Sequence, residues 1–401
     1  MKRPPKVLKK GMGRDVGDAA DAVAVRFPYP DQLLRPDGRT ATDNERRALS
    51  LLRQNPGQSR AELGRIMDIA TFSAGRIVDG LLERGLLAES DPIVKGRGHP
   101  SPALSLRPDA VHSVGVSVMT DAIHMVLVDF SGGVVAEREL RLEMSKPTAV
   151  AEHIRAAIDT MLAAQGLDRT TLAGAGLGVT GYFVGPGDRV NPPAPLDDWA
   201  LVELTPLMSE ILGCGVWLDN DGNVAALGEA LFGAGRLYAS FAYLFFAAGF
   251  GGGVVIDGAL VRGHHGNSGE FGACVPPGFP IPNLERLRAS IAASQDRPIG
   301  LAEALDLADP AAPGVSEWLT EAAGSLNLVI SSIAGVLDPE AIVLGGRLPS
   351  ALSEALIARL AFHNPERRGY RRPMPRLMAS HLAGDATAIG AATLPLKAAF
   401  F

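Results

Sequence analysis

Two stretches of the sequence share a strand–turn–strand pattern, and this repeat is the strongest constraint on the fold. The first stretch comprises the apolar runs Val114–Val118, Ile123–Val128 and Val134–Glu137, with glycines at its second turn. The second begins at Phe241 and passes through a glycine-rich loop into another apolar run that ends at Ile256. Repeated strand runs bounded by turn residues predict two related α/β lobes, and the turns of both are expected to converge on a cleft between the lobes.

A short polar motif lies between these two stretches. The segment 218–229 reads L-D-N-D-G-N-V-A-A-L-G-E, which places an acid-Asn-Asp-x-Asn sequence where a strand enters a helix of small residues. A carboxylate at such a strand end can accept the proton of a sugar hydroxyl that attacks a phosphoryl group, or can hold the hydroxyl by hydrogen bonds. The spacing does not separate these two roles for Asp221.

Length and composition indicate a soluble protein of two or three domains. Two cysteines, Cys214 and Cys274, cannot form a disulfide framework or a four-thiolate metal site, and they suit a reducing compartment. The basic start of the chain is followed by no apolar stretch, so a secretory signal is not expected and the cytoplasm is the expected location. Residues 237–256 carry no charge, but their glycines disfavour a membrane helix, and no membrane partner is expected.

Charge divides the chain into a basic head and an acidic body. Residues 1–107 contain 19 Lys and Arg against 13 Asp and Glu, a net charge of +6. The remaining residues contain 19 against 31, a net charge of −12. This asymmetry predicts that only the head meets nucleic acid. Residues 1–40 lack apolar periodicity and are expected to form a flexible basic arm.

Three short helices are expected after the arm. The first spans about Asp43–Gln54. Ser59 and Glu62 form a capping-box pattern that opens the second helix, and a short turn separates it from a third helix over about Thr71–Arg84, which Gly85 ends. The second and third helices are spaced as in a helix-turn-helix.

A helix-turn-helix places the first turn of its later helix in the major groove of DNA. The basic, glycine-rich segment Ile93–Pro100 resembles the hairpin wing of a winged helix. We therefore predict a winged helix-turn-helix domain over residues 41–107; the alternative is a small helical bundle whose arginines are merely solvated. The predicted DNA contacts are Thr71, Ser73, Arg76, Lys95 and Arg97.

Everything after the arm is similar to the ROK family, which is named for repressors, open reading frames and sugar kinases. The motifs that carry the resemblance are Asp219–Asn223, Gly249–Gly253, Gly266–Gly272 and Ile342–Gly346. Family members with a winged helix carry an actin-like, hexokinase-like (RNase H-like) α/β body that binds a sugar, and most regulate transcription. The resemblance implies a first lobe of residues 108–230 plus 385–401 and a second lobe of residues 231–384.

The resemblance also implies roles for individual residues. Asn220, Asp221 and Glu270 fall where the family contacts sugar hydroxyls, and Glu285 falls on another acidic contact position. Asp221 would also be the catalytic base if the protein were a kinase. The phosphate-loop remnant comprises Gly249, Gly251, Gly252 and Gly253.

Three departures from the family pattern argue against catalysis and against zinc. Kinases of the family begin the body with Asp-x-Gly-Gly-Thr, whereas this chain has residues 117–121 as S-V-M-T-D, whose side chains should obstruct ATP phosphates. Ala248 replaces a hydroxyl residue beside the second glycine loop. The family's zinc loop is reduced to the single Cys274, and Ala273 and Pro195 replace two further family contacts, so no zinc is expected and the ligand is expected to differ.

These observations favour a sugar-responsive transcriptional regulator, with repression favoured over activation, that binds operator DNA and a monosaccharide or sugar derivative as a homodimer or dimer of dimers. No cofactor is expected. The alternative is an active ATP-dependent sugar kinase with an accessory DNA-binding head, for which ATP would be the cosubstrate. A third reading is a constitutive DNA-binding protein whose body only dimerises.

Overall fold

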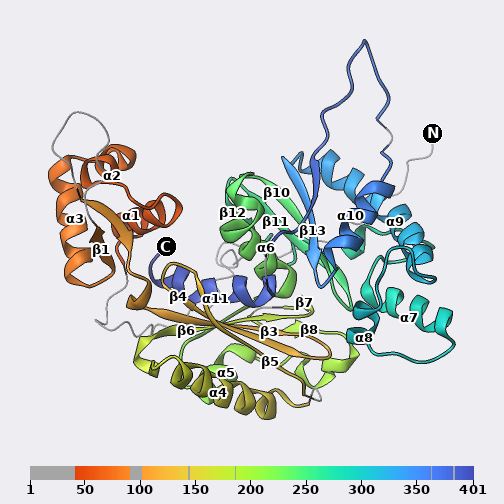
Figure 1. Ribbon diagram of the computed structural model, residues 1–401, viewed down its shortest axis with the longest axis horizontal. Helices are drawn as coiled ribbons and strands as arrows, with labels where there is room; N and C mark the ends of the chain where they lie inside the picture. Colours follow the sequence, from red (N-terminus) through yellow and green to blue (C-terminus); the bar gives the residue numbers. More distant parts are fainter. Residues whose placement is uncertain (1–40, 91–101, 143–144, 186, 363, 383) are drawn as a thin grey trace, which may run out of the picture.

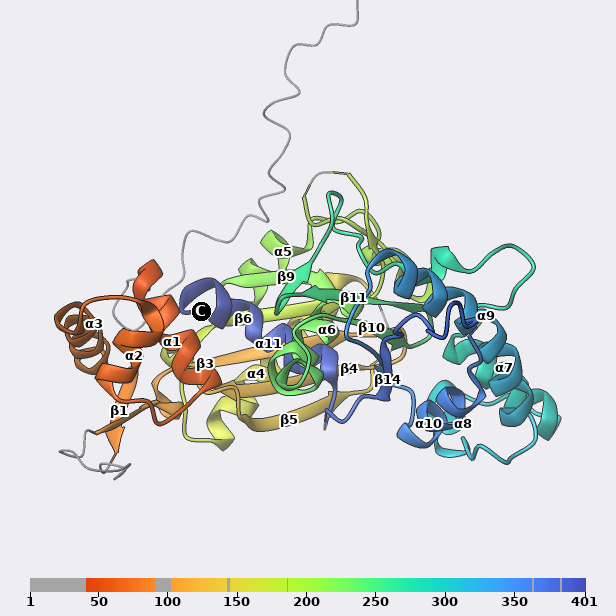
Figure 2. The same cartoon turned by 90° about the horizontal axis from the view of Figure 1, so that it is seen from above.

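The computed structural model describes residues 41–90, 102–142, 145–185, 187–362, 364–382 and 384–401 (Figure 1). The predicted basic arm at residues 1–40 lies outside the described residues, as do Lys95 and Arg97 of the predicted wing. Figure 2 shows the helical head at one end of the molecule and helices α7 to α10 at the other, with two sheets between them.

The head contains the three predicted helices, α1 (Asp43–Gln54), α2 (Arg60–Met67) and α3 (Thr71–Glu83). Capping boxes open the first two helices because Thr42 and Ser59 each accept a backbone N–H while a glutamate three residues later accepts theirs. Strands β1 (Leu87–Ser90) and β2 (Ala103–Leu106) pair antiparallel, which forms the base of a hairpin after α3. The three helices therefore lie where the sequence predicted them, whereas the predicted wing at Ile93–Pro100 lies outside the described residues.

The first sheet has the strand order β5-β4-β3-β6-β9. Strands β3, β4 and β5 form an antiparallel meander, and β6 and β9 run parallel to β3. Helices α4 and α5 cover one face and α6 and α11 the other (Figure 1). The bounds are β3 (His112–Val118), β4 (Ile123–Asp129), β5 (Val134–Leu140), α4 (Pro147–Ala164), β6 (Leu172–Val179), α5 (Leu204–Leu212), β9 (Val216–Asn220), α6 (Asp221–Phe232) and α11 (Ala386–Ala399). A small hairpin of β7 (Tyr182–Phe183) and β8 (Val190–Asn191) follows β6.

The second sheet repeats this topology with the order β12-β11-β10-β13-β14. Its first three strands again form an antiparallel meander, and β13 and β14 run parallel to β10. The bounds are β10 (Phe241–Phe246), β11 (Phe250–Ile256), β12 (Ala259–Val261), α7 (Leu284–Gln295), α8 (Leu301–Asp306), α9 (Val315–Val336), β13 (Ala341–Gly346), α10 (Ser350–Arg359) and β14 (Arg376–Ala379). The shared order confirms the prediction of two related α/β lobes.

One helix of the described chain, α9, is long and apolar enough to cross a membrane by length and composition. Half of its apolar window is buried, and Trp318, Leu326 and Ile330 on its buried side belong to the core of the second lobe. The uncharged segment 237–256, which the sequence raised as a membrane candidate, instead forms the β10–β11 hairpin.

Helix α11 packs tightly on the first lobe because glycines allow close backbone approach. A Cβ atom at Gly390 would collide with the carbonyl oxygen of Val224 on α6, and one at Gly115 on β3 would collide with the carbonyl oxygen of Ala388. Neither position has a positive φ, so the need for glycine here is steric. The helix therefore has one closely fitted position against α6 and the sheet.

The far end of α11 holds the head. Arg46 of α1 donates hydrogen bonds to the carbonyl oxygens of Lys397 (3.1 Å), Ala398 (2.7 Å) and Phe401 (3.3 Å). The Ala41 amide donates to the Ala399 carbonyl (3.1 Å). The last carbonyls of a helix lack partners within the helix, so these contacts satisfy them with groups from the head. The head is thus docked on the C-terminal end of α11 (Figure 1).

Candidate functional site

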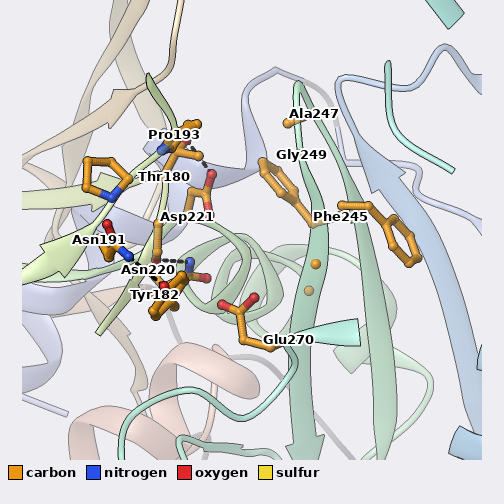
Figure 3. Close-up of a pocket in the computed structure, with 15 residues that line it drawn as sticks. Thr180, Tyr182, Asn191, Pro193, Asn220, Asp221, Phe245, Ala247, Gly249 and Glu270 are labelled. Atoms are coloured by element: carbon orange, nitrogen blue, oxygen red, sulfur yellow. Dashed lines mark hydrogen bonds between the residues drawn. The ribbon is translucent and has the colours of Figure 1, made fainter. Parts of the chain in front are cut away.

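A cavity of about 310 Å³ lies between the two lobes (Figure 3). The first lobe contributes the end of β6, the β7–β8 hairpin and the start of α6; the second contributes β10, the β10–β11 turn and Glu270. The lining residues are Thr180, Gly181, Tyr182, Asn191, Pro192, Pro193, Asn220, Asp221, Phe245, Ala247, Gly249, Phe250, Gly251, Gly252 and Glu270. The turn of the second lobe thus reaches the cavity, as predicted, whereas the corresponding β3–β4 turn of the first lobe is not part of its lining.

Asp221 is the first residue of α6 and is only 6% exposed. Its carboxylate accepts hydrogen bonds from the Thr180 hydroxyl (2.6 Å) and from the Gly222 amide (2.8 Å). Burial raises the pKa of Asp221, the nearby Asp385 raises it further, and the two hydrogen bonds oppose the shift. The Thr387 hydroxyl of α11 donates to the Asp221 carbonyl (3.3 Å), so this residue is tied to α11 as well as to the cavity.

Glu270 faces Asp221 across the cavity (Figure 3). Burial raises the pKa of its carboxyl, and the negative charge of Asp221 raises it further. Its carboxylate has no hydrogen bond or ion pair with any residue that the structure describes. Two carboxyl groups with raised pKa values in one cavity are typical of a functional site, because structural carboxylates are usually satisfied by donors.

A buried network beneath the cavity holds these residues in place. Asp219, which is 1% exposed, is ion-paired with Arg262 of the second lobe (2.6 Å). The other oxygen of Asp219 accepts from the Asn220 amide (2.9 Å) and from the Asn223 side chain (3.1 Å). Asn267 makes two hydrogen bonds with the backbone of Phe183, of 2.8 and 2.9 Å. The first lobe is thereby joined to the loop that carries Glu270.

The four glycines of the predicted phosphate-loop remnant have two different roles. A Cβ atom would meet no protein atom within 4 Å at Gly249, and only the Gly269 carbonyl oxygen (3.8 Å) at Gly251. At Gly252 it would collide with the Tyr243 carbonyl oxygen, and at Gly253 it would come 2.5 Å from the Ala226 Cβ atom. Gly252 and Gly253 therefore allow β11 to pack on β10 and α6, whereas Gly249 and Gly251 leave room beside the cavity.

Glu285 is not brought to the cavity. It lies in the first turn of α7, where its partly exposed carboxylate accepts a hydrogen bond from Arg288 (2.7 Å). Its assignment as a sugar contact stays a prediction. The polar side chains of the cavity that sequence reasoning missed are Thr180, Tyr182 and Asn191, and no motif of the sequence marked them.

The β3–β4 turn is closed by a backbone hydrogen bond and contains no glycine. The Met119 amide donates to the Ala122 carbonyl (3.0 Å), and the Met119 side chain is buried. Asp121 in this turn forms an ion pair with Arg347 of the second lobe (2.7 Å). The turn therefore contacts the second lobe directly through its own side chain.

Helix α3 presents the predicted DNA contacts at the surface. Thr71, Ser73 and Arg76 are exposed on its first turns. Phe72, between them, is 78% exposed, although an apolar residue in this helix would be expected to pack inward. Sequence reasoning missed Phe72; its place between two predicted contacts was the available signal.

The described residues contain no group of three or more His, Cys, Asp or Glu side chains that could hold a metal ion. Cys274 is exposed, and burial raises the pKa of the Cys214 thiol to about 11. Such a thiol is protonated at neutral pH and is a poor metal ligand or nucleophile.

Comparison with known proteins identifies relatives of this chain. The ROK family model matches residues 113–280. The uncharacterized protein y4fQ of Sinorhizobium fredii is 31% identical over 362 residues, which cover 89% of this chain and 92% of that protein. The xylose repressor of Bacillus spizizenii is 23% identical over 75% of this chain and 81% of the repressor. The xylose repressors of Caldicellulosiruptor bescii and Bacillus subtilis align over 57% and 59% of their own lengths.

Solved structures agree on the fold. The crystal structure of a ROK family transcriptional regulator, a homologue of the E. coli MLC protein, has a TM-score of 0.66 at 20% identity and covers 89% of this chain and 96% of its own. The ROK hexokinase of Thermus thermophilus has a TM-score of 0.54 at 25% identity and covers 70% of this chain and 97% of its own. The predicted fold class, an α/β chain with a helical head before a two-lobed hexokinase-like body, is confirmed. On the family model and the 31% identical relative, this chain belongs to the ROK family.

Proposed function

We propose that the protein is a sugar-responsive DNA-binding repressor whose two-lobed body is its effector-binding domain. One observation carries this proposal: a single helix, α11, contacts Asp221 of the cavity near its start and holds the helix-turn-helix head at its end. A ligand site and a DNA-reading element joined by one rigid element are the parts that a regulator needs. The similarity to xylose repressors supports the same class of function.

The ligand acts by favouring one arrangement of the two lobes. Asp221 belongs to the first lobe and Glu270 to the second, so a sugar that contacts both binds one lobe arrangement more tightly than others. Because α11 packs on α6 and carries the head, a shift of α6 is passed to the head. In a homodimer or dimer of dimers, such a shift changes the spacing of two recognition helices against their half-sites.

Two contacts favour this function over the kinase alternative. The Met119–Ala122 turn is closed, and Asp121 pairs with Arg347 where kinases of the family use glycines to approach ATP phosphates. The side chains of residues 119–121 stand where glycine amides would approach phosphate, and Arg347 is held by Asp121. We also propose the domain boundaries of this regulator: the DNA-binding head at 41–107, the first lobe at 108–230 plus 385–401, and the second lobe at 231–384.

A gel-shift experiment tests the proposed function. Purified protein is titrated onto DNA flanking its own gene at a fixed ionic strength, with a panel of monosaccharides and amino sugars, since protein–DNA affinity depends strongly on salt. Specific binding that one sugar reverses is the expected result. Sugar-dependent ADP release in a coupled assay without specific DNA binding would instead establish the kinase. Specific DNA binding that no sugar alters would support the constitutive DNA-binding reading.

Replacing Phe72 by Ala should lower affinity for the operator about tenfold while changing non-specific DNA binding little, because an exposed aromatic ring in the major groove contacts thymine methyl groups. The Arg76→Ala variant should weaken binding to all sequences and reduce its salt dependence if Arg76 meets phosphate. Val336→Ala is the matched control, since Val336 is 81% exposed on α9, far along the chain from the head. An operator affinity unchanged by Phe72→Ala would remove Phe72 from the interface.

A further inference from the structure

Two carboxylates and no cationic side chain are found among the described residues that line the cavity between the lobes. Asp221 and Glu270 both reach it, and none of the 15 lining residues is Lys, Arg or His. The Glu270 carboxylate has no partner within the described chain, although burial and the Asp221 charge both act on it. A partly buried carboxylate without a hydrogen-bond donor costs free energy. A ligand that donates a hydrogen bond or a positive charge to Glu270 would offset this cost.

The two arginines that join the lobes are paired with other carboxylates and not with Glu270. Arg262 is ion-paired with Asp219 (2.6 Å), and Arg347 with Asp121 (2.7 Å). A third carboxylate, Asp385 at the start of α11, adds to the negative charge that acts on Asp221. The charged residues that line the cavity are therefore all acidic, which disfavours phosphorylated sugars and sugar acids.

The other lining groups suit a polyhydroxylated ring. The Thr180 hydroxyl and the amides of Asn191 and Asn220 can exchange hydrogen bonds with hydroxyl groups. Tyr182 and Phe250 add aromatic surface, which attracts positive charge as well as the apolar faces of sugar rings. These groups and the two carboxylates together fit a small ring that carries both hydroxyls and a positive charge.

We propose that the effector is an amino sugar with a free amine, whose ammonium group binds between Asp221 and Glu270. This inference rests on the proposed function, that the cavity binds a sugar effector. Hydrogen bonds from an ammonium to carboxylates are stronger than those from a hydroxyl. The N-acetylated form of the same sugar loses this advantage because the amide carries no charge.

Isothermal titration calorimetry on the full chain at pH 7 tests the proposal with matched pairs. The pairs are D-glucose with D-glucosamine, D-mannose with D-mannosamine and D-galactose with D-galactosamine; the corresponding N-acetyl sugars and D-glucuronate complete the panel. In at least one pair the amine should bind about tenfold more tightly than its neutral parent, the difference between a charged and a neutral hydrogen bond. The N-acetyl form should lose that gain, and glucuronate should not bind.

The Glu270→Gln variant links the preference to the site. It keeps the shape of the side chain and removes one charge, so the ratio of amine to neutral affinity should fall towards one. Glu321→Gln, an exposed position on α9 that pairs with Arg286, is the matched control and should keep the wild-type ratio. If the Glu270→Gln substitution impairs folding in a thermal melt, the wild-type ratios alone decide.

The outcomes separate this inference from the proposed function. Neutral sugars that bind as tightly as their amines, or tight binding of glucuronate, would overturn the amine proposal and leave a sugar-binding regulator in place. Binding of no compound in the panel, together with DNA binding that no sugar changes, would overturn both.

Discussion

Replacing Asp221 by Asn should abolish the release of DNA by sugar while DNA binding itself persists. The carboxylate now accepts from both the Thr180 hydroxyl and the Gly222 amide. An amide has one acceptor oxygen, so at least one of these donors loses its partner, and the ligand loses the charge that it binds. The helix-turn-helix does not contact Asp221, so its affinity for the operator should stay close to that of the wild type.

The measurement is a gel shift titrated with the effector, together with calorimetry of the effector on the same variant. Asp257→Asn is the matched control: Asp257 is an exposed turn residue with φ of 51°, a conformation that Asn adopts readily. The control should respond to sugar as the wild type does. Release of DNA from the Asp221→Asn protein at the wild-type sugar concentration would show that the effector binds elsewhere.

The sequence predicted the elements well where local chemistry marks them. The first helix of the head begins at Asp43 and ends at Gln54 as expected, and the capping box at Ser59 opens the second. The third was expected to reach Arg84 but ends one residue earlier, with Arg84 as its cap. The repeat of the strand–turn–strand pattern could be predicted because apolar runs bounded by turn glycines recur in both lobes.

Contacts between distant segments could not be predicted in the same way. The ion pair of Asp219 with Arg262 joins residues 43 positions apart, and Arg46 meets carbonyls more than 350 positions away. No local pattern marks such pairs, since only the packed fold brings them together. Glu285 shows that a position inferred from resemblance can also lie elsewhere. It lies on α7, outside the cavity lining.

The roles of individual glycines within one motif could not be predicted from the sequence either. The run from Gly249 to Gly253 suggested a single purpose, close approach to phosphate. In the fold, Gly252 and Gly253 are required by the packing of β11 on its neighbours, and only Gly249 and Gly251 border open space. A steric requirement of this kind depends on what lies opposite each residue, which the sequence does not state.

The Gly390→Ala substitution should be the most destabilising single change that we predict. The added Cβ atom would collide with the Val224 carbonyl oxygen, which is backbone inside α6 and cannot rotate away. Overpacking of this kind costs about 3 kcal/mol in a well-packed interior. Because α6 begins at Asp221 and α11 ends at the head, the same displacement should also weaken the effect of sugar on DNA binding.

Gly335→Ala is the matched control. Gly335 is also a helical glycine with ordinary φ, but a Cβ atom there would meet no atom within 4 Å, so Ala should be neutral or raise stability by about 0.5–1 kcal/mol. Thermal and denaturant unfolding of both variants, followed by the sugar-titrated gel shift, measure the two effects. A Gly390→Ala protein as stable as the wild type would mean that α11 does not fit closely against α6. A destabilised variant with an intact sugar response would mean that the signal reaches the head by another route, because α11 would then have moved without changing the coupling.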